Sequence, residues 1–374
     1  MAKNRSSEVD IIRMAALIGI CVVNVPFMAL PDGGLLSIPE GLDLVASFFV
    51  TFFFELKFFL LFSFIFGWGM AIQARSADSR GQSFARRYFG RMLGLALMGV
   101  AHAIWVFNGD ILLLYALLGC VLWLFRDYSS RALIKIALWM LPLSIVCLLI
   151  LGLLLESSGD FLESSETVSS VGPSLGGTFL EATQKRLADW SETFVFLVLT
   201  QGSMTFAAFL VGLAAAKSDF FAPDCESYSQ LRQKLPWLVV AGLILNFLYA
   251  ATLLELIPES YEILAILGFL LIPLGAPALS ALYLYLFIQL ARRVNIIYIL
   301  VLAGRNSLST YILQGVLAGF IFGAYGLGLY GSVGYAGLLP LSLLIALSAM
   351  ILVGVYAKIF GRGPLEPVLR WFSN

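Results

Sequence analysis

The chain is poor in charge and has a single histidine. Only 12% of its 374 residues are charged, Lys and Arg balance Asp and Glu at 23 each, and His102 is the one imidazole. A basic stripe or patch is the electrostatic requirement for binding nucleic acid, and a weakly charged chain with no net charge offers none overall. We therefore expect no nucleic-acid partner.

Paired cysteines and the motifs of common soluble enzymes are also missing. Cys21, Cys120, Cys147 and Cys225 show no regular spacing, and three of them lie in apolar runs, where a thiol behaves as a small hydrophobic group. The GxSxG elbow, the Walker loop, the GxGxxG fingerprint, the HExxH pattern and the EF-hand loop are absent from the sequence. We expect neither a disulfide framework nor a metal site, and the soluble chemistries of those motifs are disfavoured.

What the sequence has in abundance is apolar residues, 60% of the total, gathered in long runs. Strict alternation of apolar and polar residues, the mark of a membrane barrel, is absent. The predicted fold is therefore all-α, a polytopic membrane helix bundle with residues 1–374 as one integral membrane domain. About ten runs are long enough to cross a bilayer as a helix: 11–30, 48–73, 88–107, 111–125, 133–155, 193–216, 235–256, 263–290, 296–322 and 336–360.

The basic residues predict the orientation of the bundle. With the N-terminus inside, 20 of the 23 Lys and Arg lie at inner helix ends, and the exceptions are Lys57 within a span and Lys185 and Arg186 outside. Because cytoplasmic loops are enriched in Lys and Arg, both termini are predicted to be cytoplasmic, with membrane lipids as neighbours.

The longest outer connection, residues 156–192, contains a Ser- and Gly-rich stretch followed by FLEATQKRLADW, residues 179–190. The stretch is typical of a turn, and the pattern that follows predicts an amphipathic helix lying at the membrane interface. The alternative is a solvated loop without a role.

Four polar side chains from four helices are predicted in the outer half of the membrane, with Lys57 just beyond one of them. At 1.5 Å per helical residue, His102 and Asn24 each lie roughly 21 Å above the inner end of their helix. Asp110 follows His102 at an outer turn, and Glu55 and Lys57 lie near the outer end of another span. Because ionisable groups at membrane depth are costly, each is a candidate for function.

His102 is the candidate general base, since neutral imidazole accepts a proton near neutral pH and a carboxylate fixes its tautomer. Asn108-Gly109 provides the turn that would fold Asp110 back onto it, and Glu55 is the rival partner. Two alternatives remain open: a packed imidazole without chemistry, and a purely structural ion pair between Glu55 and Lys57.

Arginines gather at the opposite, inner surface. Their guanidinium groups present several donors in a fixed fork that suits phosphate. The alternative is that they extend to lipid headgroups under the positive-inside bias. The candidate set for binding a phosphorylated cofactor is Arg13, Arg87, Arg91, Arg305 and Asn306.

Several ordered motifs resemble the YeiB-type family of bacterial inner-membrane proteins, and they span most of the chain. They are Asp10 to Arg13 with Asn24, LFSFIFGWG (61–69), ARRYFGRM (85–92), AHAIWVFNGDILLLYALLG (101–119), AGRNSLSTYILQ (303–314), FGAYGLGLYG (322–331) and GRGPLEPVLR (361–370). The resemblance implies a multi-pass protein of the bacterial inner (plasma) membrane.

That family is more distantly similar to the transmembrane acyltransferases, which include heparan-alpha-glucosaminide N-acetyltransferase and the acyltransferase-three proteins. Arg13 matches the first-helix arginine of the acyltransferase-three group, and Arg87 with Arg91 is the nearest equivalent of its arginine pair. Asn24 stands where that group has a histidine, although the heparan enzyme has an asparagine at the end of the equivalent helix. His102 would then have to supply the base.

The resemblance thus implies an acyltransferase that takes acyl-CoA or acetyl-CoA as donor. The inner arginines would bind its phosphates, and His102, Asp110 and Asn24 would act on an acceptor hydroxyl or amine of a glycan, lipid or small molecule. The substrate pocket is predicted at Glu55, Lys57, Tyr311 and Gln314. The alternative is a transporter or channel for a small metabolite or lipid, although no internal repeat supports it. A homodimer is left open.

Overall fold

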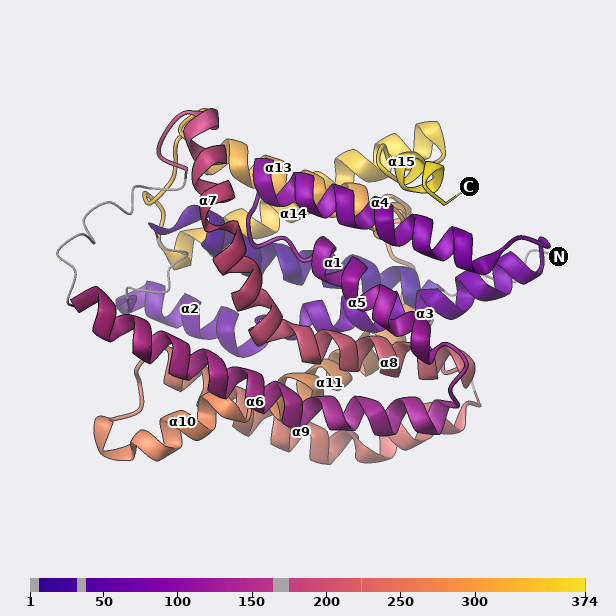
Figure 1. Cartoon of the computed structure of the whole chain (residues 1–374), viewed down its shortest axis with the longest axis horizontal. Coiled ribbons are helices and arrows are strands. Elements are labelled where there is room, and N and C mark those ends of the chain that lie inside the picture. The colour runs from indigo at the N-terminus through magenta and orange to yellow at the C-terminus, as the bar shows by residue number, and fades with distance from the viewer. Residues whose placement is uncertain (1–6, 32–37, 164–174, 223, 374) are drawn as a thin grey trace.

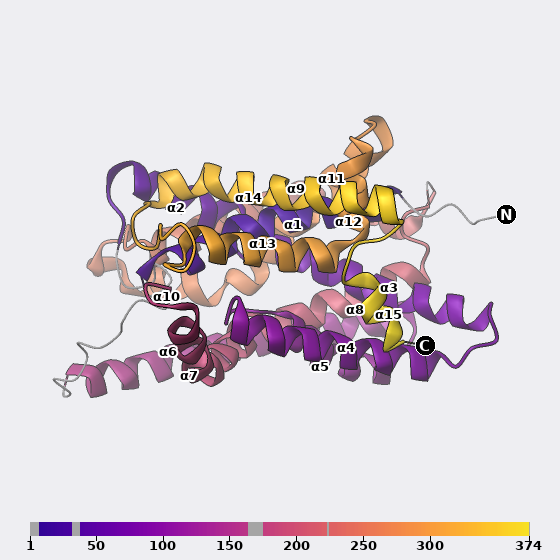
Figure 2. The ribbon, with the colours of Figure 1, turned by 90° about the horizontal axis from the view of Figure 1, so that it is seen from above.

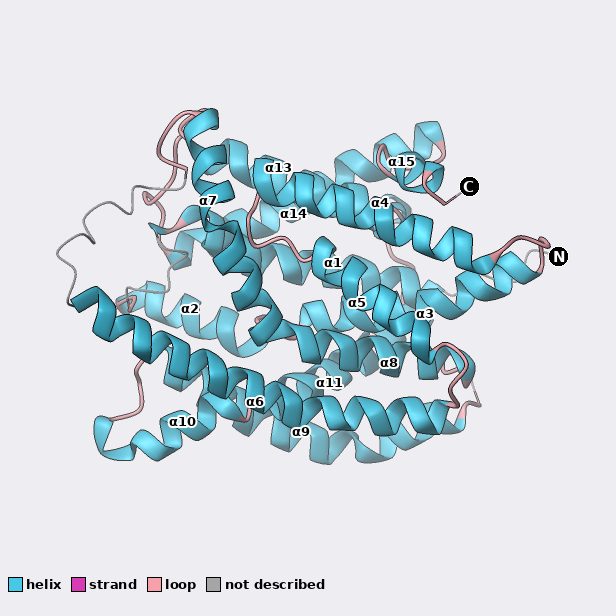
Figure 3. Ribbon diagram, viewed as in Figure 1, coloured by secondary structure: helices cyan, strands magenta, loops and turns pink. Residues whose placement is uncertain are grey.

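The computed structural model describes residues 7–31, 38–163, 175–222 and 224–373, and its regular elements are all helical (Figure 3). The predicted all-α class is confirmed. The α-helices are α1 (Ser7–Ala29), α2 (Gly41–Phe53), α3 (Phe58–Asp78), α4 (Phe84–Trp105), α5 (Leu112–Leu122), α6 (Ser130–Glu163), α7 (Phe179–Leu197), α8 (Ser203–Lys217), α9 (Glu226–Leu253), α10 (Glu262–Leu270), α11 (Ile272–Arg293), α12 (Tyr298–Arg305), α13 (Ser307–Phe322), α14 (Tyr335–Phe360) and α15 (Glu366–Trp371). Short tighter or wider turns are η2 (Trp123–Phe125), η4 (Val198–Gly202) and η5 (Glu259–Tyr261).

Within the described residues, seven helical segments are long and apolar enough to cross a membrane. Two shorter apolar segments, Leu112–Phe125 and Ser307–Phe322, add to them. A membrane helix bundle is therefore confirmed, while a total of ten crossings with both termini inside stays a prediction. Helix α4 is not in that set, although its 22 residues would extend about 33 Å.

Three predicted spans are interrupted rather than continuous. The run 48–73 is divided between α2 and α3 by a break at residues 54–57, and 263–290 is divided between α10 and α11. Pro273 lies at the start of α11, where its missing N–H is tolerated. The run 296–322 is divided between α12 and α13 at Asn306. Apolar patterning predicts the depth of a segment but not a break within it.

A helix is present where the amphipathic one is predicted, as the first part of α7, and its position at the membrane interface stays a prediction. Thr178 and Glu181 form a capping box at its start, and α7 passes through η4 directly into α8. Residues 164–174 of the predicted outer connection lie outside the described residues.

The helices run roughly along one axis of the molecule (Figure 1). Figure 2 shows α13 and α14 on one side of the bundle and α4 and α5 on the other. The main apolar core lies around α3 and α8, which pack at very short range. A Cβ on Gly67 would collide with the Phe209 carbonyl, and one on Gly212 with the Phe64 carbonyl. These two glycines let the backbones of α3 and α8 approach closely.

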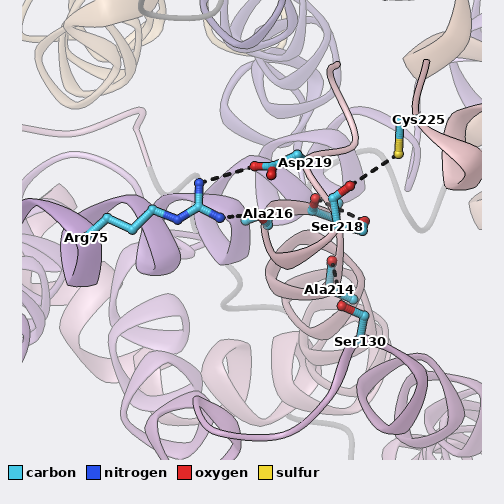
Figure 4. A network of polar contacts seen from close by, with 8 residues as sticks. Arg75, Ser130, Ala214, Ala216, Ser218, Asp219 and Cys225 are labelled. Atoms are coloured by element: carbon cyan, nitrogen blue, oxygen red, sulfur yellow. Dashed lines mark hydrogen bonds and ion pairs between the residues drawn. The ribbon is translucent and has the colours of Figure 1, made fainter. Parts of the chain in front are cut away.

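A polar network fixes the end of α8 that lies near the start of α6 (Figure 4). Arg75 of α3 donates from Nη2 to the Ala216 carbonyl at 2.7 Å and lies 3.4 Å from Asp219 Oδ1. Ser130 Oγ donates to the Ala214 carbonyl at 3.3 Å. A cation at a helix C-terminus satisfies carbonyls that have no partner within the helix. The α3–α8 pair is thereby held at its end as well as along its length.

Candidate active site

The centre of the candidate site is a hydrogen bond between the side chains of His102 and Asp110. The amides of Val106 and Phe107 both bond to the His102 carbonyl, which ends α4, and the chain then turns so that the Asp110 amide bonds to the Phe107 carbonyl. His102 Nδ1 lies 2.8 Å from Asp110 Oδ1. The two residues are only 4% and 2% exposed. The contact that the sequence predicts across Asn108-Gly109 is therefore present, and Glu55 is not the partner.

The second oxygen of Asp110 holds the carboxylate in place. Asp110 Oδ2 accepts a hydrogen bond of 2.8 Å from the Leu112 amide at the start of α5. A carboxylate that accepts from Nδ1–H leaves the other imidazole nitrogen with its lone pair. His102 Nε2 is buried and has no hydrogen-bond partner among the described residues. With the proton assigned to Nδ1, Asp110 orients the imidazole, and Nε2 is free to accept a proton.

His102 lines a small enclosed cavity between α1, α4 and α13. Asn24 and Cys21 border it from α1, and Tyr311, Gln314 and Gly315 border it from α13. Its volume of about 10 Å³ is close to the minimum that holds one water molecule. The cavity is therefore closed to any larger ligand in this conformation.

Two polar atoms around this cavity, His102 Nε2 and Gln314 Oε1, have no partner within the described part of the chain, and the Tyr311 hydroxyl lies close to the Asp110 carboxylate. The Tyr311 ring lies 5.2 Å from the His102 ring, centroid to centroid. Buried polar atoms in native proteins are nearly always hydrogen-bonded, and exceptions mark functional sites or bound molecules. The predicted residues His102, Asn24, Tyr311 and Gln314 thus come together at one cavity.

Sequence reasoning missed Cys21 and Gly315. A Cβ on Gly315 would stand 2.6 Å from His102 Nε2, so the absence of a side chain there keeps the imidazole nitrogen free. A single glycine in an apolar helix carries no sequence signal for this role. Cys21 was interpreted only as a small hydrophobic residue, and its Sγ lies 3.5 Å from the Ser342 carbonyl.

Glu55 and Lys57 do not line this cavity but occupy the break between α2 and α3. Tyr249 of α9 donates to Glu55 Oε1 at 2.8 Å. Lys57 is fully buried, and its Nζ donates to the Thr51 carbonyl at 2.7 Å. Leu56 between them has a φ of 62°. A left-handed non-glycine residue is unfavourable and persists only where its surroundings enforce it.

Side chains of α11 satisfy the backbone groups freed by this break. Ser280 Oγ donates to the Lys57 carbonyl at 3.1 Å, and Tyr283 Oη donates to the Phe53 carbonyl at 2.9 Å. Interrupted helices occur at membrane depth only where protein or water satisfies the freed groups. Glu55 and Lys57 therefore belong to a second polar cluster, separate from His102.

The inner arginines divide into two kinds. Asp10 is fully buried, and its oxygens lie 3.5 Å from Arg13 Nη1 and 2.6 Å from Arg305 Nε. Asn306 donates to the Leu302 carbonyl and accepts from the Gly363 amide, both at 2.8 Å. These three predicted ligands are therefore engaged in contacts that join α1, α12 and the segment before α15.

Arg87 and Arg91 differ from the others. They are one turn apart on α4, and Arg87 Nη1 and Arg91 Nε are buried without a hydrogen-bond partner in the described ranges. A Cβ on Gly90 between them would collide with the Phe372 carbonyl, so α15 lies directly against this turn of α4. Figure 2 shows α15 between the α13–α14 side and the α4 side of the bundle. Of the predicted phosphate ligands, these two have unsatisfied buried donors.

The described residues contain no group of three or more His, Cys, Asp or Glu side chains arranged to hold a metal ion.

In comparison with known proteins, the sequence is similar to proteins of the YeiB type. Residues 215–374 match the family described as "Protein of unknown function (DUF418)". The chain is 28% identical to "Uncharacterized protein YxaH" of Bacillus subtilis (strain 168), over 99% of this chain and 94% of that protein. It is 25% identical to "Uncharacterized protein YeiB" of Escherichia coli (strain K12), over 98% and 95% respectively. No solved structure matches the chain.

A third relative is an "Uncharacterized 39.9 kDa protein in amylase 3'region" of Bacillus acidopullulyticus, 26% identical over 99% of this chain and 94% of that protein. The resemblance predicted from the motifs is confirmed at the level of the YeiB-type proteins. The matched residues, 215–374, include Asn306, Tyr311 and Gln314. Arg87 and His102 precede the matched range.

Proposed function

We propose that this YeiB-type membrane protein, whose residues 215–374 match the DUF418 family, is an acyltransferase with His102 as its general base. The observation that carries the proposal is the free, buried Nε2 of His102, oriented through Nδ1 by Asp110 and facing a cavity. An imidazole so oriented can take a proton from a hydroxyl or amine at neutral pH. The site would lie in a bacterial inner membrane.

The reaction we propose is transfer from acyl-CoA to an acceptor hydroxyl or amine of a glycan, lipid or small metabolite. The acceptor proton passes to His102 Nε2, and the acceptor oxygen or nitrogen attacks the thioester carbonyl. The C–S bond then breaks, and the departing thiolate takes the proton, giving the acylated acceptor and free CoA. Asn24 and Tyr311 border the same cavity and would donate to the developing oxyanion, and Gln314 Oε1 would accept a hydrogen bond from the acceptor.

The donor phosphates are assigned to Arg87 and Arg91, because their unsatisfied nitrogens suit an anion. Arg13 and Arg305 contribute less to this assignment than the sequence predicted, because Asp10 already neutralises part of their charge. Along α4, Arg87 and His102 are 15 residues apart, which corresponds to about 22 Å. A thin, extended donor with phosphates at one end and a reactive carbonyl at the other matches that separation.

The test is to supply purified protein in lipid vesicles with acetyl-CoA labelled in the acetyl group, and to follow the label into lipid, glycan or small-molecule acceptors. We expect transfer by the parent protein and none above background by His102→Ala. Asp110→Asn should lower the rate by about 10²–10⁴-fold, because the amide no longer selects the Nδ1–H tautomer. Label transfer by His102→Ala at the parent rate would exclude this mechanism.

A second candidate function is transport of a small metabolite or lipid. The observation in its favour is the Glu55–Lys57 cluster, because many transporters bind substrate at interrupted helices near the membrane midplane. Uptake of an unmodified solute into vesicles, lost in Glu55→Gln but kept in His102→Ala, would support transport instead of transfer.

A further inference from the structure

The outer end of α4 is covered by α7, and one buried arginine makes the contact. Arg186 is 3% exposed. Its Nε donates to the Ile104 carbonyl and its Nη2 to the Trp105 carbonyl, each at 3.0 Å. These carbonyls belong to the last turn of α4, where no further helical amide is available to them. The guanidinium thus closes the helix end that carries His102.

The helix that bears Arg186 also rests on the residues around the cavity. Ala182 of α7 and Leu175 before it belong to the same apolar cluster as Cys21, Val25 and Phe107, which line the cavity. The Leu175 carbonyl accepts a 2.9 Å bond from the Ala324 amide. The start of α7 therefore forms part of the cover over the His102 cavity.

A natural bend point follows at the other end of α7. The π turn η4, Val198–Gly202, joins α7 to α8 without a loop. π turns are local irregularities at which helices bend, and they are frequent at functional sites. Because α8 is held against α3 through Gly67 and Gly212, motion at this turn would displace α7 while α8 stayed in place.

Polar contacts also hold α7 to the end of α4. Besides the two bonds of Arg186, the Asn108 amide donates to Thr193 Oγ1 at 3.4 Å, a long bond. Polar contacts can be exchanged for water with little net change in free energy, unlike buried apolar area. The cavity of about 10 Å³ admits no acceptor while this cover is in place.

We infer that α7 is a hinged gate over the His102 cavity, that η4 is its hinge, and that Arg186 is its latch. The open form connects Nε2 with the side of the membrane on which α7 lies and admits the acceptor there. The identity of the entering molecule as an acyl acceptor rests on the proposed function. The opening of the gate does not depend on the proposed function. It can be measured without any acyl transfer.

Cys21 is a built-in reporter of opening, because it is 3% exposed and lines the cavity. In purified protein with Cys120, Cys147 and Cys225 replaced by alanine, the rate of modification of Cys21 by methyl methanethiosulfonate reports how often the cavity opens. Arg186→Met should raise this rate by about tenfold or more, because two charge-assisted hydrogen bonds are lost. The matched control is Lys185→Met on the same helix, which removes a cation bound only to Asp189. Its rate should stay within about twofold of the parent.

A second variant keeps the test decisive if Arg186→Met fails to fold. Asn108→Cys with Thr193→Cys places two thiols at positions whose side chains touch in the closed form. Oxidation of this pair should suppress modification of Cys21, and reduction should restore it. An unchanged Cys21 rate in folded Arg186→Met, an equal rise in Lys185→Met, or full modification in the oxidised pair would each overturn the gate. Loss of acyl transfer with normal gating would instead count against the proposed function alone.

Discussion

At the scale of single residues, the site depends on what does not touch His102 Nε2. Asp110 holds the far side of the ring, and Gly315 leaves the near side free. A histidine bonded at both nitrogens would be a structural residue. The free nitrogen and the unsatisfied Gln314 Oε1 beside it are what favour chemistry over packing.

Gly315→Ala tests that point with a single methyl group. The new Cβ would stand 2.6 Å from Nε2 and take the place of the reacting atom. We expect transfer to fall by about tenfold or more, each tenfold corresponding to ~1.4 kcal/mol in the barrier. Steady-state rates measured with labelled acetyl-CoA would show it.

The control is Gly69→Ala in α3, where an added Cβ meets nothing within 4 Å. It should leave the rate unchanged and raise helix stability by up to about 1 kcal/mol. Equal rates in both variants would mean that the space before Nε2 is not used.

Residue-scale prediction succeeded where partners are close in sequence and failed where they are distant. His102 and Asp110 are eight residues apart, and the turn chemistry between them predicted their contact. Asp10 and Arg305 are 295 residues apart, so their ion pair could not be foreseen and Arg305 was interpreted as a free ligand. Arg186 was counted only as an outer charge for the same reason.

At the scale of elements, breaks in the helices decide which polar groups meet. The apolar run 48–73 predicted one span, and the charged pair Glu55 and Lys57 was the only sequence sign of an interruption. The break turns the Glu55 side chain toward Tyr249 of α9 and the Lys57 side chain toward the Thr51 carbonyl of α2, and neither lines the His102 cavity. Periodicity could not predict this, because the packing of distant helices compensates the freed backbone groups.

Tyr249→Phe tests whether the break depends on its polar partners. Removing the hydroxyl leaves half-buried Glu55 without its 2.8 Å donor, which should lower the free energy of unfolding by about 1–3 kcal/mol. Thermal unfolding in detergent would measure this loss. Tyr261→Phe, at a residue that is 61% exposed, should change nothing measurable. If the two variants unfolded at the same temperature, the polar cluster around Glu55 would not contribute to the stability of the fold.

At the scale of the whole molecule, His102 lies near one end of α4 and Arg87 and Arg91 near the other, and a different helix contacts each end. Helix α7 contacts the end that carries His102 through Arg186, and α15 contacts the other end beside Gly90. The positive-inside pattern assigns these ends to opposite sides of the membrane. A donor from the cytoplasm and an acceptor from outside would then meet along one helix.

Cysteine labelling tests that assignment in a background without native cysteines. Gln184→Cys on α7 should react with an impermeant maleimide in intact spheroplasts. Arg80→Cys, in the exposed turn between α3 and α4, should react only after permeabilisation. The opposite pattern would reverse the predicted orientation of the bundle.

The most direct measurement is the release of free CoA thiol from acetyl-CoA, per molecule of protein, in vesicles that contain acceptor. The parent protein should release thiol and acylate acceptor in equal amounts. His102→Gln should lower both by about 10²–10⁴-fold while the protein stays folded. Thiol release by folded His102→Gln at the parent rate would contradict the assignment of His102 as the base.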